Sequence, residues 1–78
     1  MRHIHEEDED IVKIFSSRLR RLRKEYDFTQ EELAEKADIS YKNIQYLESK
    51  NPTCPNLRTL DKLAKGFNLS LSELFKFK

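Results

Sequence analysis

The sequence predicts an all-α protein, a compact bundle of five short helices. Apolar residues recur every three or four positions, which is the spacing of one helix face. Glycine occurs once and proline twice in 78 residues, so an all-helical chain with short connections is favoured over a turn-rich fold. The length suits a single domain with a modest core, and the lone Cys54 excludes an internal disulfide.

The charges divide the chain into two regions. Residues 1–10 form an acidic leader with five carboxylates and a single arginine, and we expect this leader to be flexible. Residues 11–78 form the predicted folded domain, with 14 basic and nine acidic residues and a net charge of +5. A basic domain of this kind suits contact with phosphate, although a charge-rich solvated surface has the same composition.

The first helix is expected to start between Asp8 and Asp10, because negative charge stabilises a helix N-terminus. Its apolar stripe comprises Ile11, Phe15, Leu19, Leu22 and Tyr26. The opposite face is basic and forms either a solvated surface or a phosphate contact; it comprises Arg18, Arg20, Arg21, Arg23 and Lys24.

Two further helices follow, joined by a tight turn. Thr29 and Glu32 make a capping box that opens the second helix, which is expected to end near Asp38. Ser40 caps the third helix, which is expected to reach about Lys50. The inward-facing residues of this pair are Leu33, Ala34, Ala37, Ile39, Ile44 and Leu47.

A proline-containing loop over residues 51–56 precedes the last two helices. The fourth helix starts at Asn56, is weakened by Gly66 and ends at Asn68, which tolerates left-handed backbone. Its inward face comprises Leu57, Leu60, Leu63, Ala64 and Phe67. Ser70 and Glu73 form a second capping box, which opens a short fifth helix containing Leu71, Leu74, Phe75 and Phe77.

The third helix is polar for its position, since most of its side chains can form hydrogen bonds and few face the core. This division fits a helix that lies in the DNA major groove and offers donors and acceptors to base edges. The segment over residues 28–48 resembles the helix-turn-helix of the Cro and phage-repressor family, on the residues FTQEELAEKADISYKNIQYLE. The similarity continues through Asn51-Pro52-Thr53, the leucines over 57–64 and the segment 71–75, and covers about residues 15–75.

The resemblance implies a lambda-repressor-like fold and a DNA-binding regulator, with the short controller proteins of restriction–modification systems favoured over phage repressors. The family usually has glycine where this chain has Asp38, so the turn is expected to carry some strain. The base-reading positions implied by the resemblance are Tyr41, Lys42, Gln45 and Tyr46. The implied phosphate contacts are Gln30, Asn43, Lys50, Asn51, Thr53 and Asn56. Arg23 and Glu48 match a structural ion pair.

The apolar side chains near the C-terminus predict a homodimer, because so short a chain cannot bury all of them alone. The predicted interface comprises Leu69, Leu71, Phe75 and Phe77. A two-fold dimer would read two half-sites about 34 Å apart. Its expected partners are double-stranded DNA and RNA polymerase, which it would block or recruit.

The alternative function is an antitoxin-like interaction module that binds a partner protein through its acidic leader or apolar end. No nucleophile, base and orienting acid share a recognisable spacing, so we expect no enzyme and no cofactor. His3 and His5 lack a third ligand, so no metal site is predicted. With no apolar run long enough to span a bilayer, we expect a cytoplasmic protein. The resemblance implies bacterial or phage origin and association with the nucleoid.

Overall fold

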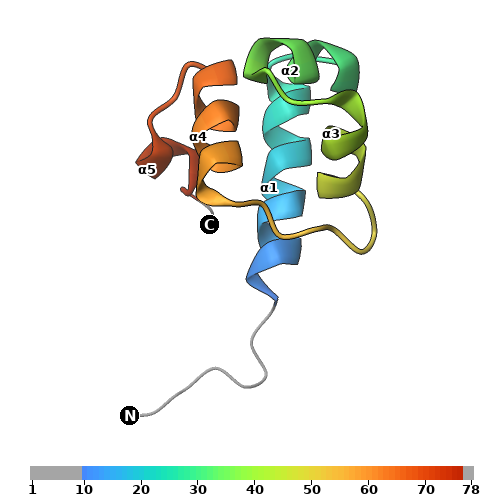
Figure 1. Ribbon diagram of the computed structural model, residues 1–78. Helices are drawn as coiled ribbons and strands as arrows, with labels where there is room; N and C mark the ends of the chain where they lie inside the picture. Colours follow the sequence, from blue (N-terminus) through green and yellow to red (C-terminus); the bar gives the residue numbers. More distant parts are fainter. Residues whose placement is uncertain (1–9, 77–78) are drawn as a thin grey trace.

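The computed structural model describes residues 10–76, which contain five helices and no strand (Figure 1). The helices are α1 (Ile11–Glu25), α2 (Gln30–Ala37), α3 (Tyr41–Leu47), α4 (Leu57–Gly66) and α5 (Leu71–Leu74). In Figure 1, α1 runs through the middle of the bundle, with α3 on one side, α4 on the other and α2 at one end. The all-helical, five-helix prediction is confirmed, while residues 1–9 of the acidic leader lie outside the described residues.

Each helix begins at a side chain that caps its first turn, and the sequence predicts three of these caps, at Thr29, Ser40 and Ser70. The Thr29 hydroxyl accepts from the Glu32 N–H at 3.0 Å, and the Glu32 carboxylate accepts from the Thr29 N–H at 2.8 Å. Such reciprocal bonds satisfy backbone donors that have no partner inside the helix. The other caps are Asp10 for α1, Ser40 for α3, Asn56 for α4 and Ser70 for α5.

The second capping box predicts a pH effect at α5. The Ser70 backbone N–H, which donates to Glu73 Oε1 at 2.9 Å, and then the Ser70 side chain lower the pKa of the Glu73 carboxyl from its ordinary 4.5. Because the folded pKa lies below the unfolded one, this stabilisation is complete above about pH 4.5 and is lost as the pH falls through the lowered value. Carboxyl ¹³C titration should give a lower Glu73 midpoint in the native protein than in urea, and equal midpoints would contradict the capping assignment.

One apolar core holds the helices together, and all of its members are buried. They are Phe15, Leu19, Leu22, Leu33, Ala34, Ala37, Ile44, Leu47, Leu63, Ala64, Phe67 and Leu74. Three residues predicted for the apolar faces lie at the surface instead: Ile11 and Leu57, each in the first turn of its helix, and Tyr26, which follows α1 and is 39% exposed. Ile11 is 61% exposed in α1 and Leu57 is 70% exposed in α4.

The end of α3 also differs from the prediction, since the helix ends at Leu47 rather than near Lys50. Glu48 leaves helical geometry with φ −99° and ψ 3°, and its carboxylate turns inward. The segment from Ser49 to Asn56 then crosses to α4 as an extended loop (Figure 1).

Gly66 allows α4 to approach α2 closely. A Cβ atom at this position would lie 3.0 Å from the Ala37 Cβ and 3.1 Å from the Ala37 Cα and backbone nitrogen. Alanine is favoured over glycine inside helices by up to about 1 kcal/mol, whereas overpacking costs about 1–3 kcal/mol. We therefore expect Gly66→Ala to lower the free energy of unfolding by about 1 kcal/mol in urea denaturation. The exposed Lys65→Ala is the control, and a gain in stability for Gly66→Ala would contradict the close approach.

Candidate nucleic-acid interface

The outer face of α3 carries the four side chains predicted to read bases. Tyr41, Lys42, Gln45 and Tyr46 are all exposed, and no hydrogen bond within residues 10–76 engages their side chains. On the opposite face, Ile44 and Leu47 are buried in the core. A helix anchored by two apolar residues can therefore present its donors and acceptors in a fixed orientation.

A tight turn sets α3 at an angle to α2. Asp38 ends α2 in the left-handed conformation, with φ 59° and ψ 47°, which is the conformation predicted for this turn position. The Ile39 N–H donates to the Ala34 carbonyl at 2.9 Å, and Lys62 Nζ donates to the Asp38 carbonyl at 3.2 Å. These bonds support the left-handed residue from α2 and from α4.

An ion pair ties α1 to the end of α3. Arg23 Nε donates to Glu48 Oε2 at 2.7 Å and a terminal Arg23 nitrogen donates to Glu48 Oε1 at 3.0 Å. The Glu48 side chain is 2% exposed and that of Arg23 is 14% exposed. Arg23 also donates to the Phe28 carbonyl at 2.8 Å, so one guanidinium links α1, the α1–α2 turn and α3. A guanidinium that donates two hydrogen bonds to one carboxylate is held by charge and in a defined orientation.

Gln30 joins this network, which the sequence does not reveal. Its Nε2 donates to Glu48 Oε1 at 2.9 Å from the first turn of α2. An amide nitrogen carries two protons, so the second remains for another acceptor such as a phosphate oxygen. The contact holds the Gln30 side chain beside the end of α3.

The other residues predicted to contact phosphate are distributed over α3 and the following loop. Asn43 is half-buried, whereas Lys50, Asn51 and Thr53 are exposed. Asn56 has a structural role in addition, because its Oδ1 accepts from the Thr59 N–H at 2.8 Å and caps α4. Its amide nitrogen is left to reach an anion.

The basic face of α1 performs two structural tasks that the sequence left open. Arg18 donates to the Leu74 carbonyl at 3.2 Å and to the Glu73 carbonyl at 2.9 Å, so it fixes α5 against α1. Arg20 donates to the Glu48 carbonyl at 2.9 Å, so it satisfies a free carbonyl at the end of α3. These partners lie 56 and 28 residues away in the chain, beyond any helical periodicity.

The residues predicted for a dimer interface are only partly at the surface. Leu69 and Leu71 pack against the core, Phe75 is 38% exposed, and Phe77 lies outside the described residues. Phe75 lines an apolar groove of about 350 Å³ between the start of α1 and the α3–α4 loop. The other lining residues are Ile11, Val12, Phe15, Cys54, Pro55 and Leu60.

Within residues 10–76, no three histidine, cysteine or acidic side chains lie close enough together to hold a metal ion. His3 and His5 lie outside this range. None of the helices described is long and apolar enough to span a membrane.

Comparison with known proteins finds transcriptional regulators among the relatives of this chain. An HTH-type transcriptional regulator of Archaeoglobus fulgidus, whose own role is uncharacterized, is 41% identical over 61 residues, which cover 78% of this chain and 86% of the relative. The cryptic phage CTXphi transcriptional repressor RstR of Vibrio cholerae is 39% identical over 61 residues, and the match spans 54% of its length.

Solved structures of the restriction-modification controller protein C.Esp1396I share the fold at 25% identity. The wild-type protein superposes with a TM-score of 0.78, covering 88% of both chains. The same controller bound to a 19-base-pair DNA duplex gives a TM-score of 0.79, covering 87% of this chain and 89% of that one. The helix-turn-helix family profile matches residues 19–74, from α1 to α5. The chain therefore belongs to the helix-turn-helix family of Cro/C1-type transcriptional regulators.

Proposed function

We propose that this regulator binds DNA as a homodimer and reads one operator half-site per subunit by placing α3 in the major groove. The observation that carries the proposal is the exposed face of α3, where four polar side chains stand on a helix anchored by Ile44 and Leu47. The fold is similar to that of a controller protein solved on a DNA duplex, which favours the same mode of docking.

The side chains on α3 have complementary chemistry for base edges. Lys42 is suited to guanine acceptors and Gln45 to the donor and acceptor of adenine. Tyr41 and Tyr46 offer apolar contact to thymine methyl groups and a hydroxyl to phosphate. The phosphate contacts proposed around them are Gln30, Asn43, Lys50, Asn51, Thr53 and Asn56. Together they would fix the orientation of α3 without adding sequence preference of their own.

The second copy is proposed to dock on the α4–α5 end through Leu69, Leu71, Phe75 and Phe77, of which only Phe77 lies outside the described residues. The apolar groove beside Phe75 would extend this interface towards α1. A two-fold dimer would then bind half-sites about 34 Å apart, on the nucleoid in the cytoplasm, and block or recruit RNA polymerase.

Selection from a library of random duplexes, followed by sequencing at two salt concentrations, tests the proposal. We expect a two-fold symmetric site that survives at the higher salt concentration. Only weak, sequence-independent enrichment that disappears at higher salt would reject it, because that is the behaviour of non-specific phosphate contact. A partner-binding module, like an antitoxin, would then become the leading function.

Substitutions on the selected site separate base reading from phosphate contact. Lys42→Ala and Gln45→Ala should each weaken binding by about 1–3 kcal/mol and relax preference at one base pair in each half-site. Lys50→Ala should weaken binding to all duplexes alike, while Lys65→Ala, on α4, serves as the control. Fluorescence anisotropy with singly substituted duplexes measures the affinity of each variant for each base-pair change. If Lys42→Ala weakens binding to all of these duplexes equally, Lys42 does not read a base.

A further inference from the structure

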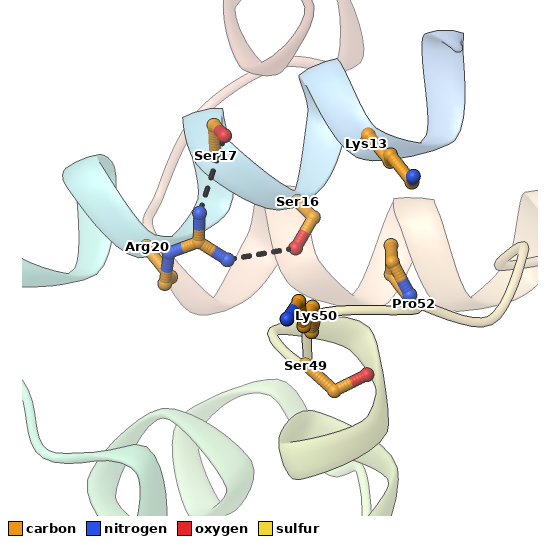
Figure 2. Close-up of a pocket in the computed structure, with 7 residues that line it drawn as sticks. All are labelled: Lys13, Ser16, Ser17, Arg20, Ser49, Lys50 and Pro52. Carbon is orange, nitrogen blue, oxygen red and sulfur yellow. Dashed lines mark hydrogen bonds between the residues drawn. The ribbon is translucent and has the colours of Figure 1, made fainter.

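A pocket lined by basic and hydroxyl groups lies between α1 and the segment that follows α3 (Figure 2). It has a volume of about 250 Å³, and none of the residues that line it within the described chain is acidic. One wall is the face of α1 and the other is the start of the α3–α4 loop. Its polar lining comprises Lys13, Ser16, Ser17, Arg20, Ser49 and Lys50.

Arg20 is held in position at the wall of this pocket. One terminal nitrogen donates to Ser16 Oγ at 3.0 Å and to the Glu48 carbonyl at 2.9 Å, and the other donates to Ser17 Oγ at 3.2 Å. Figure 2 shows the guanidinium directed at both serines. An arginine fixed in this way loses little further conformational entropy when an anion binds.

The two serine hydroxyls can donate hydrogen bonds to an anion. Each hydroxyl oxygen accepts a hydrogen bond from Arg20, so its own proton is available to another acceptor. Ser16 is only 2% exposed and belongs to the few buried polar residues of the described chain. Arg20 also neutralises the carbonyl at the end of α3, where the helix dipole would otherwise repel an anion.

Lys13 and Lys50 complete the site from opposite walls, and both are exposed with no ion pair within residues 10–76. Three cations around one small pocket repel one another until an anion joins them. The volume is below the roughly 300–1,000 Å³ of pockets for drug-sized ligands, so a small anion fits better than an extended molecule.

We propose that this pocket binds a phosphate group, with Arg20 and the two serines as fixed donors and Lys13 and Lys50 as neutralising charges. The phosphate comes either from the backbone of bound DNA beside the end of α3 or from a free phosphate-bearing molecule. The first source rests on the proposed function, whereas the second does not. Lys13, Arg20 and the serines add a contact from α1 to those proposed on α3 and its loop.

The experiment has a DNA arm and a phosphate arm. In the first, Lys13→Gln is expected to weaken binding to every duplex by about two- to fivefold and to reduce the slope of log K against log salt by about 0.9. The control Lys65→Gln removes one positive charge from α4 and should change neither the affinity for duplexes nor the salt slope. Replacing single phosphates by neutral methylphosphonates then locates the contact. At the phosphate that the pocket binds, the replacement should weaken binding of the wild type but should not weaken binding of Lys13→Gln any further.

In the second arm, inorganic phosphate is titrated into the free protein at constant ionic strength, with chloride as the matched salt. Saturable ¹H–¹⁵N shifts at Ser16, Ser17 and Lys50, lost in Lys13→Gln, would assign the pocket to free phosphate. A methylphosphonate position coupled to Lys13 would assign it to the DNA backbone. The inference is overturned if no methylphosphonate position is coupled to Lys13 and inorganic phosphate causes no saturable shifts. This result is distinct from failure of the duplex selection, which would count against base reading by α3.

Discussion

Replacing Arg23 by alanine is expected to lower the free energy of unfolding by about 3–5 kcal/mol, because it leaves a buried carboxylate without its counter-charge. Glu48 is 2% exposed and would keep only its bond from Gln30. Urea denaturation followed by circular dichroism measures the loss. In thermal unfolding, the midpoint should fall by at least about 12 °C.

Two neighbouring variants sharpen this result. Arg21→Ala removes an exposed arginine from the same helix and should change stability by no more than about 0.5 kcal/mol. Arg23→Lys keeps the charge but cannot reproduce the two parallel bonds, so its stability should lie between those of the wild type and Arg23→Ala. A loss below about 1 kcal/mol for Arg23→Ala would show that the ion pair does not hold α3 to α1.

Phe67→Ala is expected to cost about 3–5 kcal/mol, the range measured for large core aromatics. Phe67 is 1% exposed, and its ring centroid lies 5.0 Å from that of Tyr26 and 5.9 Å from that of Phe28. The substitution leaves a cavity where the α1–α2 turn meets the end of α4, so both the apolar burial and the ring contacts are lost.

The control for Phe67→Ala is Tyr46→Ala, which removes an exposed aromatic ring from α3 and should leave the stability within about 0.5 kcal/mol of wild type. Urea denaturation of both variants gives the comparison. Equal losses in the two variants would contradict the placement of Phe67 in the core and of Tyr46 on the outer face.

Signals that act over one helical turn made most of the fold predictable. The capping boxes at Thr29 and Ser70 mark helix starts because both partners lie within four residues. Asp38 and Asn68 adopt the left-handed backbone that their side chains tolerate, with φ 59° and 61°. Asp27 does the same with φ 62°, but no pattern in the sequence singled it out.

Features that depend on distant partners were not predictable in the same way. The helical period does not predict the exposure of Ile11 and Leu57, which depends on how other helices pack around the first turns of α1 and α4. The end of α3 at Leu47 depends on Glu48, which Arg23 and Gln30 draw inward from other helices.

The candidate site divides along the same line. The outward face of α3 follows from the local pattern of polar and apolar residues. The pocket around Arg20 does not, because its two walls come from segments about 30 residues apart that only the folded bundle brings together. In the sequence, the α1 residues proposed to bind phosphate were therefore indistinguishable from a solvated basic face.

The most direct test of the central claim is the ratio of affinities for the selected duplex and for a scrambled duplex of the same base composition, measured at physiological salt. Base reading by α3 predicts that the selected duplex binds at least about 10³-fold more tightly. It also predicts that Gln45→Ala reduces this ratio while leaving the affinity for the scrambled duplex unchanged. Equal affinities for the two duplexes in the wild-type protein would contradict sequence-specific recognition by α3.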